Sequence, residues 1–461
     1  MPTLANQLAE WIASSDPATL PAETRETARR LLLDVAGLCV AARHADYVAA
    51  TLASVDPGGV CTVIGGRGGY DAFGAALVNG TAAHGEDFDD TFEGGPVHAG
   101  AVVVPAVVAA CERERLGGDR LLIGIVTGTE LMCRLSLVAP KATHAAGFHP
   151  TAVFGALAAA AGVSAALRLE PPASASALGI AGSMASGIIE YLADGSSTKR
   201  MHAGWAAQSG IRAALMARGG FIGPRTVLEG QHGFYRAFAP SVTPDFEPLQ
   251  EGLGGRWLME QIAFKPYACG TMTQPFVDCA IELAEQGVAA ADIDTITCEV
   301  AEGTVHRLWE PLSVKHRPPT PYAAKFSTPY CMAVGFFDRR AGFAQFTESR
   351  VNDPAVLALA SRIRYSINPH DEYPRNFSGH LRATLKNGSQ REVRRPHMRG
   401  GVHAPLSSEE LEGKFVDNVL YGGWSREQGE RFRDLSRTVF SHRFGFLFQF
   451  SDATQTGYRA R

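Results

Sequence analysis

Long runs rich in alanine and leucine fill the first 260 residues of the chain, and they constrain the fold more than any other feature. Alanine favours helix formation, and its small side chain lets helices pack closely. The run at 23–43 begins amphipathic and ends apolar, as a helix that enters a core would. A compact all-helical bundle is therefore expected here. The further helix candidates are residues 71–90, 101–116, 121–138, 149–168, 173–192 and 202–218.

The pattern changes from about residue 256, where strands are expected between helices. Ile296, Cys298 and Val300 alternate with polar residues, which is typical of a half-buried strand. Residues 381–393 hold an Asn-Gly pair between two alternating runs, a strong signal for a β-hairpin. Helices are expected at 275–286, 327–340, 354–363, 407–420 and 425–440.

These patterns predict a mainly α protein of two domains, as the length of 461 residues also suggests. Residues 1–264 and 400–461 are expected to form one all-helical domain from both ends of the chain. Residues 265–399 are expected to form a smaller, inserted α+β domain. Insertion of one domain into another is a common architecture, because chain termini often lie close together.

Composition and charge exclude several classes of function. A net charge of −4 gives no reason to expect nucleic acid or an anionic membrane as a partner. The N-terminus shows no secretory signal pattern, and the apolar run at 152–167 is too short to span a bilayer. The eight cysteines are scattered without a CxxC pair, which suits a reducing compartment. A soluble, cytoplasmic protein is expected.

A cluster of acidic and histidine side chains lies within residues 79–105, beside an apolar helix candidate. It contains His84, Asp87, Asp89, Asp90 and His98. His84, Asp87 and either Asp90 or Thr91 are spaced three or four apart, so on a helix they would share one face. His98 follows a glycine-rich turn and could fold back over that face. The alternative is a solvated acidic loop with an incidental histidine.

Two further stretches place histidines and cations at the expected starts of helices. His149 precedes Pro150 at the start of an apolar helix, where the helix dipole would lower the histidine pKa and keep the ring neutral. Lys199, Arg200 and His202 follow a Gly-Ser turn, where a helix N-terminus and cations can bind a carboxylate. The alternatives are a capping histidine and a solvated basic turn.

Two more basic stretches lie in the expected second domain. Lys265 stands between Phe264 and Pro266, so its ammonium group is expected to be held rather than free on a flexible surface. His306 and Arg307 follow an expected strand. The alternatives are a lysine that reaches solvent past apolar neighbours, and ordinary surface charges.

Together these residues suit a cleft that binds a small di- or tricarboxylate. Cations bind carboxylates and stabilise the enolate that forms when a proton next to a carboxylate is removed, while Asp and His side chains move protons. A metal site of His84, Asp87, His98 and His149 is the alternative, but its spacing matches no standard ligand set. Dinucleotide, phosphate-loop and nucleophile-elbow motifs are absent from the sequence.

Six segments in order carry a resemblance that runs from about residue 5 to residue 440. They are NGTAAHGEDFDD, HAGAVVVPA, GFHPTAVFG, DGSSTKRMHAGWAAQSG, GFIGPRTVLEGQHGFYRAF and FKPYACG. The chain resembles the MmgE/PrpD family, which includes 2-methylcitrate dehydratase, cis-aconitate decarboxylase and iminodisuccinate epimerase. The resemblance implies a cofactor-free homodimer with a large helical domain, a smaller α+β lid, and an active site in the cleft between them.

The resemblance also implies roles for single residues. Asp87 and His98 would be the general base and acid, in an order that stays open. Lys199, Lys265 and His149 would hold carboxylates and stabilise the enolate. No metal and no cofactor is expected. The further candidates for substrate binding are His84, Arg200, His202 and His306.

A 2-methylcitrate dehydratase-like hydro-lyase is the leading expectation, and a decarboxylase or an epimerase acting in the same cleft is the alternative. A non-catalytic carboxylate-binding protein is a further alternative, although the His, Asp and Lys positions of the motifs are all kept. The family's lid tyrosine has no counterpart here, and His306 is the nearest proton-transfer group. Gln274 stands where the family often has a histidine, at a position expected to set substrate identity.

Overall fold

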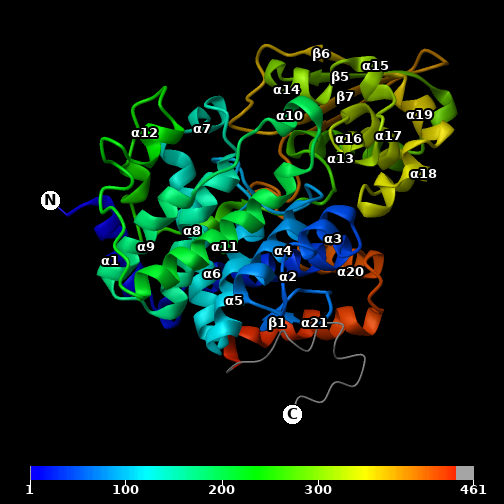
Figure 1. Ribbon diagram of the computed structural model, residues 1–461. Coiled ribbons are helices and arrows are strands. Elements are labelled where there is room, and N and C mark those ends of the chain that lie inside the picture. Colours follow the sequence, from blue (N-terminus) through cyan, green and yellow to red (C-terminus); the bar gives the residue numbers. More distant parts are fainter. Residues whose placement is uncertain (1, 443–461) are drawn as a thin grey trace. The chain divides into compact units, whose positions relative to one another are not determined.

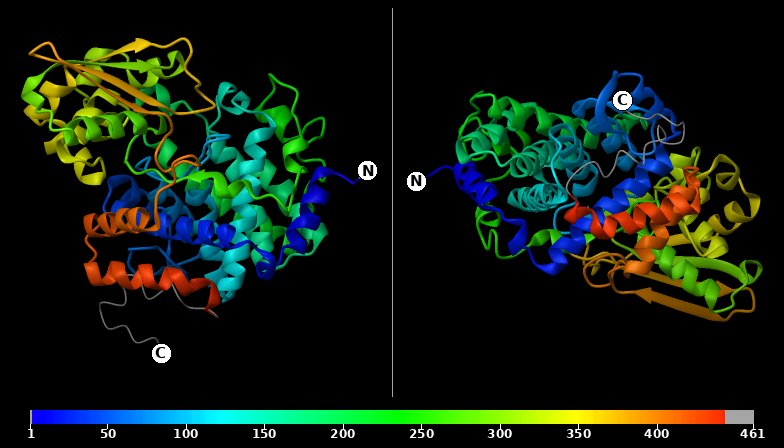
Figure 2. Two further views of the ribbon diagram at one scale, coloured as in Figure 1. Left: turned by 180° about the vertical axis from the view of Figure 1, so that it is seen from behind. Right: turned by 90° about the horizontal axis from the view of Figure 1, so that it is seen from below.

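The chain forms two compact units, seen in the computed structural model that describes residues 2–442 (Figures 1 and 2). Unit 1 contains the described residues up to Gly85, Asp89–Ile262 and those from Glu412, and unit 2 contains Glu86–Phe88 and Ala263–Leu411. Three residues of the acidic stretch therefore belong to unit 2, while their neighbours in sequence belong to unit 1. Residues 443–461, which the sequence assigns to the helical domain, lie outside the described residues.

Unit 1 is mostly helical, as expected for the first part of the chain. Its described α-helices are α1 (Leu4–Ser14), α2 (Ala22–Ala42), α3 (Asp46–Leu52), α4 (Ala72–His84), α5 (Ala99–Glu114), α6 (Gly118–Val138), α7 (Ala142–Ala145), α8 (Pro150–Leu167), α9 (Pro171–Met184), α10 (Tyr191–Asp194), α11 (Thr198–Arg218), α12 (Phe234–Phe238) and α21 (Arg426–Thr438). Helix α20 (Ser408–Tyr421) begins in unit 2 and continues into unit 1. Short 3-10 turns lie at Pro17–Thr19, Glu247–Leu249, Leu258–Gln261 and Val439–Ser441.

Helix α8 forms the centre of unit 1. It is buried along nearly its whole length and packs against α5, α6, α9 and α11. Its alanines and glycines present little side-chain bulk, so four neighbouring helices can approach it at core packing density. The expectation that residues 152–167 form a buried helix is confirmed.

Helices α6 and α8 are, among the described residues, the two that are long and apolar enough to cross a membrane by length and composition alone. The expectation that the run at 152–167 is too short for this is therefore wrong, because α8 begins at Pro150. Of their most apolar stretches, 94% and 89% are buried inside the protein. That degree of burial is what core helices show, because their apolar side chains are already covered by protein.

Two glycines let α4 and α11 cross with their backbones close together. A Cβ atom on Gly80 of α4 would lie 2.6 Å from the Cα of Gly204 on α11, and a Cβ on Gly204 would lie 2.0 Å from a backbone oxygen of α4. Any larger residue would push the helices apart. The crossing matters for function, since α4 ends in His84 and α11 carries His202.

Small strands also lie in unit 1, where the helix pattern does not predict them. Strands β1 (Pro57–Thr62) and β2 (Gly69–Tyr70) pair antiparallel. Strand β3 (Thr91–Phe92) follows the acidic stretch, and β4 (Ile262–Ala263) lies where the chain passes from unit 1 to unit 2.

Unit 2 contains a sheet with the strand order β6–β5–β7–β8. Strand β5 (Ile293–Val300) pairs parallel with β6 (Ile363–Ile367) and antiparallel with β7 (Gly379–Leu385), which pairs antiparallel with β8 (Gln390–Arg395). The Asn-Gly turn joins β7 to β8 with Gly388 at a φ of 83°, so the expected hairpin is confirmed.

The helices of unit 2 lie against this sheet and one another. Helix α13 packs on β7 and β8 and contacts α17. The described α-helices are α13 (Gln274–Glu285), α14 (Glu302–Leu308), α15 (Leu312–His316), α16 (Pro321–Ala324), α17 (Thr328–Asp338), α18 (Glu348–Val351) and α19 (Pro354–Ala360), with 3-10 turns at Thr271–Thr273, Ala290–Asp292 and Phe343–Phe346.

Two helices end earlier than the sequence pattern predicts. Helix α4 ends at His84 instead of near residue 90, and α9 ends at Met184 instead of near residue 192. Asp87 has a φ of 56°, which is incompatible with a right-handed helix. The expected helical face shared by His84, Asp87 and Asp90 is therefore wrong, because the chain leaves the helix directly after His84. The mainly α fold class is confirmed.

Candidate active site

Four buried histidines form one continuous cluster in the described part of unit 1. His84 is the last residue of α4, His98 and His149 directly precede α5 and α8, and His202 lies on α11. The ring centroid of His84 lies 4.9 Å from that of His98 and 5.4 Å from that of His149. The centroids of His149 and His202 lie 5.3 Å apart. The helix ends of unit 1 thus bring together imidazoles that are far apart in sequence.

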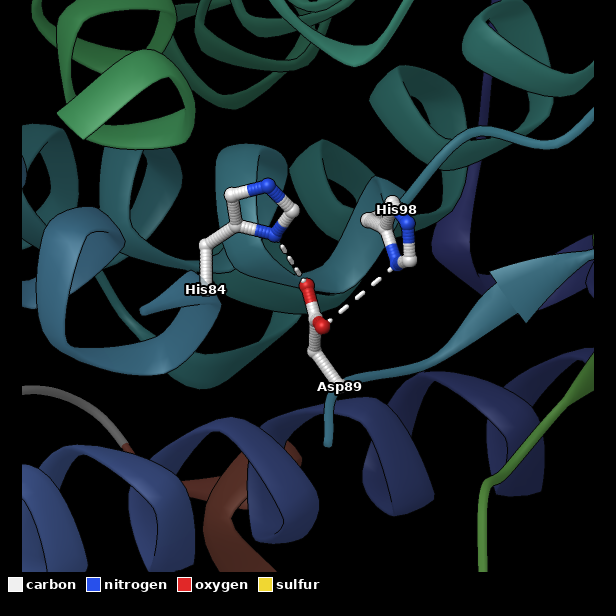
Figure 3. Close-up of side chains that lie close together, drawn as sticks. All are labelled: His84, Asp89 and His98. Atoms are coloured by element: carbon white, nitrogen blue, oxygen red, sulfur yellow. Dashed lines mark hydrogen bonds and ion pairs between the residues drawn. The ribbon is translucent and has the colours of Figure 1, made fainter. Parts of the chain in front are cut away.

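Asp89 joins two of these histidines (Figure 3). His84 Nδ1 lies 2.7 Å from Asp89 Oδ2, and His98 Nδ1 lies 3.4 Å from Asp89 Oδ1. The Asp89 carboxylate is fully buried, and burial of an unpaired carboxylate would be costly. The hydrogen bond from His84 offsets part of this cost. His84, Asp89 and His98 are called the His–Asp–His group below.

Hydrogen bonds at the Nδ1 atoms orient both rings of the His–Asp–His group. His84 Nδ1 donates to the Asp89 carboxylate, and His98 Nδ1 donates to the backbone oxygen of Asp90 at 2.7 Å. In a neutral imidazole, a proton on Nδ1 leaves a lone pair on Nε2. His84 Nε2 is buried and has no hydrogen-bond partner within residues 2–442. Both rings can therefore accept a proton at Nε2, as a general base must.

His149 and His202 form a second pair, with their Nδ1 atoms 3.1 Å apart. Burial first, and then the nearby His84 and Lys199, hold the pKa of His149 well below its usual range. Burial, followed by the same two neighbours, lowers the pKa of His202 to about 4. Both rings are therefore neutral near pH 7. This neutral state is the one expected for His149, but burial is the main cause, not the helix dipole.

Asp90 holds the start of α5, and with it His98. Its two carboxylate oxygens accept the Gly100 N–H at 3.0 and 3.1 Å, while its backbone oxygen accepts the bond from His98. Burial, followed by the negative charge of Asp89, raises the pKa of Asp90 to about 8. Asp90 is therefore mostly protonated near pH 7, which removes one of two neighbouring negative charges from this buried region.

In unit 2, Lys265 binds Asp87. Its Nζ donates to the Asp87 backbone oxygen at 2.9 Å and lies 3.5 Å from Asp87 Oδ1. Lys265 is fully buried, and only 5% of Asp87 is exposed. The left-handed backbone of Asp87 costs free energy for a residue with a Cβ atom, so bonds that hold it there are needed. The expectation that the Lys265 ammonium group is held rather than free is confirmed.

The sequence matches the model of the MmgE/PrpD N-terminal domain over residues 6–247 and that of the MmgE/PrpD C-terminal domain over residues 267–438. The chain belongs to the MmgE/PrpD family. A cis-aconitate decarboxylase from Homo sapiens is 31% identical over 358 residues, which cover 75% of this chain and 72% of the relative. One from Aspergillus terreus is 28% identical over 469 residues, covering 94% of this chain and 92% of the relative.

A third relative agrees with these two. The cis-aconitate decarboxylase from Mus musculus is 29% identical over 362 residues, covering 75% of this chain and 71% of the relative. The two family models together span both described units, and the relatives are enzymes that break carbon–carbon bonds. This member of the MmgE/PrpD family is accordingly an enzyme of the lyase class.

Three further candidate residues differ in their surroundings. Lys199 lies half-buried in the first turn of α11, and its charge contributes to the lowered pKa of His149. Arg200 lies with its guanidinium group 4.5 Å from the ring centroid of Tyr47. His306 is exposed on α14 of unit 2. Lys199 thus acts on the histidine cluster electrostatically, while Arg200 stacks on an aromatic ring.

Asp89 and Tyr191 lie at the histidine cluster, although the sequence pattern does not single them out. The Tyr191 ring on α10 lies 6.2 Å from the ring of His149 and 5.9 Å from that of His202. Its sole signal in the sequence is its position in the same segment as Lys199. In the sequence Asp89 lies between two other candidate carboxylates, Asp87 and Asp90. The point at which α4 ends decides which of the three faces His84.

Gln274 fixes the backbone that follows Lys265. Its Oε1 accepts the Tyr267 N–H at 3.1 Å, and its Nε2 donates to the backbone oxygens of Tyr267 and Cys269, each at 2.9 Å. The side chain is fully buried. These bonds give Gln274 a structural role. Its expected influence on substrate identity stays a prediction.

The His–Asp–His group has donor atoms of the types that bind a metal ion, and they lie within 4.8 Å of one another. Both Nδ1 atoms, however, are engaged as donors, one to a carboxylate and one to a carbonyl. A metal at those nitrogens would have to replace the two protons and break both bonds. These bonds disfavour a metal at the Nδ1 atoms but leave the Nε2 atoms as ligand candidates, and the metal-free site stays a prediction.

Proposed function

We propose that this lyase is a cofactor-independent, cis-aconitate decarboxylase-like enzyme that acts on a small tricarboxylate. The observation that carries the proposal is the cluster of buried imidazoles joined to Asp89, in a chain whose relatives named above are cis-aconitate decarboxylases. Those relatives favour decarboxylation over the dehydration of 2-methylcitrate that the sequence motifs put first.

The chemistry of this reaction sets three tasks for the protein. Decarboxylation of cis-aconitate breaks a carbon–carbon bond and releases CO₂, and the electron pair passes into a carbanion conjugated with the remaining double bond. Addition of one proton at the far carbon of that system gives itaconate. The enzyme must therefore bind carboxylates, stabilise the spread negative charge, and deliver a proton to carbon.

The buried histidines suit the proton delivery. His98 is proposed as the proton-transfer residue, because its ring is oriented through Nδ1 and can exchange a proton at Nε2. Asp89 and Asp90 would hold it in that orientation. Asp87 keeps the acid or base role that the family resemblance implies.

The cations suit the binding and stabilisation of negative charge. Lys199 and Lys265, together with His149, are proposed to hold the substrate carboxylates and the carbanion, as the resemblance implies. Ammonium groups in a site with little water interact more strongly with an anion than they do in solution. His84, Arg200, His202 and His306 are the further proposed contacts of the substrate.

The proposal also covers the organisation of the enzyme. It describes a cytoplasmic homodimer, with a helical domain from both chain ends and an inserted α+β lid. All eight cysteines, which lie within residues 2–442, are free and buried, as suits a reducing compartment. Sedimentation equilibrium of the purified protein tests the dimer, and the mass of a monomer at micromolar concentration would overturn that part.

A proton NMR time course in D₂O tests the reaction. The purified enzyme is given cis-aconitate, 2-methylcitrate, citrate or iminodisuccinate in separate samples, with the His98→Ala variant as a control for contaminating activity. The expected product is itaconate from cis-aconitate, with one solvent deuteron on carbon. Loss of water from 2-methylcitrate instead would restore the dehydratase. Deuterium exchange in iminodisuccinate without net conversion would favour an epimerase.

A further inference from the structure

Lys325 is a buried lysine of unit 2 that neither the sequence motifs nor the family resemblance singles out. It follows α16 directly and is 1% exposed. Its Nζ donates to the backbone oxygen of Glu86 at 3.1 Å and lies 3.0 Å from Glu86 Oε2. The rings of Phe343 and Phe346 lie 5.2 and 4.8 Å from the same nitrogen.

The surroundings of Lys325 offset only part of the cost of burying its charge. Burial of an ammonium group is costly, and one carboxylate with two aromatic faces offsets part of that cost. An apolar side chain of similar length would fill the space without any such cost. Stability alone therefore gives little reason for a lysine here, and the bond to Glu86 becomes the feature to explain.

Lys325 and Lys265 act on neighbouring residues of one short segment. Lys325 binds the carbonyl of Glu86, and Lys265 binds the carbonyl of Asp87. Phe88 adds a third attachment, because its ring centroid lies 5.7 Å from that of Phe343. All three residues of the segment Glu86–Phe88 are thus tied to unit 2 by side chains from elsewhere in that unit.

The middle residue of this segment is the one that needs to be held. Asp87 has a left-handed backbone with a φ of 56°, which an aspartate leaves readily for more favourable conformations. The segment is followed directly by Asp89, the residue that joins His84 and His98. The conformation of Glu86–Phe88 therefore sets the direction of the Asp87 side chain. It also sets the direction in which the backbone enters Asp89.

We propose that Lys325 is a positioning residue. It acts through Glu86 to hold Asp87, and the backbone that leads into Asp89, in the active conformation. The catalytic consequence rests on the proposed function, whereas the ordering of the segment does not. Lys325 itself binds no substrate in this proposal, so its loss lowers kcat and leaves KM nearly unchanged.

The test compares three variants by hydrogen exchange and by turnover. Lys325→Met removes the charge and keeps the length of the side chain, and Glu86→Gln removes the carboxylate while it keeps the backbone bond. Arg362→Met is the matched control. Arg362 is a half-buried cation of unit 2 that also donates to two backbone carbonyls, those of Ala290 and Ile293, and it does not contact Glu86–Phe88.

Loss of a hydrogen bond from a charged group should raise amide exchange in a peptide covering residues 84–92 about tenfold or more in Lys325→Met, and less in Glu86→Gln. Arg362→Met should leave exchange there unchanged. Turnover of cis-aconitate should fall about tenfold in Lys325→Met, through kcat, and by no more than twofold in the control.

Unchanged exchange at 84–92 in folded Lys325→Met would overturn the proposal, and so would unchanged kcat in an enzyme whose wild type is active. If Lys325→Met does not fold, the exchange in Glu86→Gln decides in the same way. If the wild-type enzyme makes no itaconate, the proposed function fails, and the exchange results alone decide whether Lys325 orders the segment.

Discussion

Units 1 and 2 both bury titratable groups, but they bind them in opposite ways. In unit 1 they include a cluster of imidazoles, which contact one another and Asp89. In unit 2 they are the ammonium groups of Lys265 and Lys325, which donate to backbone carbonyls of one short segment. An imidazole whose second nitrogen bears a lone pair can accept a proton there. An ammonium group has no lone pair and acts through its positive charge.

This difference suits two separate tasks, proton transfer and charge stabilisation. Proton transfer needs groups that accept a proton in one step and release it in another, and an imidazole with a lone pair on Nε2 can do so. Stabilising a carbanion needs a charge that stays in place, and a buried lysine with carbonyl and carboxylate partners provides one. We therefore expect substitutions in unit 1 to alter proton transfer, and lysine substitutions to alter charge or position.

The substitution His98→Ala should have the largest effect on activity. Removal of a general acid or base costs about 10²- to 10⁴-fold in turnover, so kcat for cis-aconitate should fall by that factor. The exposed His232→Ala serves as the control, and thermal melts should show both variants folded. An active His98→Ala variant with near-wild-type kcat would remove unit 1 from the proton-transfer step.

The substitution Asp89→Asn tests whether orientation of the rings matters as much as their presence. An amide keeps the size of the side chain but removes the charge to which His84 Nδ1 donates, so the favoured tautomer of His84 changes. A loss of about 10²-fold in kcat is expected. Long-range ¹⁵N–¹H spectra of labelled histidines should show the tautomer shift, and the exposed Asp56→Asn variant should not. A fall in kcat without any tautomer shift would contradict this explanation.

The substitution Lys199→Met tests the fixed charge next to the histidine cluster. Since the charge of Lys199 lowers the pKa of both His149 and His202, its removal should raise both values. Loss of a carboxylate-binding cation should also weaken kcat/KM for cis-aconitate by about tenfold to 10²-fold. Histidine titrations by NMR measure the first effect. Unchanged histidine titration together with full activity would refute both roles.

The smallest expected effect concerns stability and pH. His202 takes up a proton near pH 6.5 in the unfolded chain but only at about 4 in the folded one. Between these values the unfolded state binds more protons than the folded state. The contribution of neutral His202 to the free energy of unfolding is therefore fully present above pH 6.5 and is lost as the pH falls towards 4. It amounts to about 3 kcal/mol at most. Denaturant unfolding at pH 7 and pH 5 should therefore show a smaller pH dependence in His202→Phe than in the wild type.

Much of the fold could be predicted from local patterns. The alanine-rich runs predict the helices of unit 1, and the Asn-Gly pair predicts the hairpin β7–β8, because helix propensity and turn chemistry act between near neighbours. The end of α4 could not be predicted in this way. The sequence stays compatible with a helix beyond His84, and the bonds of Lys265 and Lys325 to the next residues belong to tertiary structure.

The candidate site likewise has features that local sequence predicts and features that depend on tertiary structure. The sequence by itself determined the residue types, the family, and the positions of His98, His149, Lys199 and Lys265, because these stand in ordered motifs. Only the tertiary structure decided that Asp89, rather than Asp87, lies between His84 and His98, and that His149 meets His202. The reason is physical. Burial and the partners of a side chain depend on residues that are distant in sequence, and those partners decide which protons an imidazole can carry.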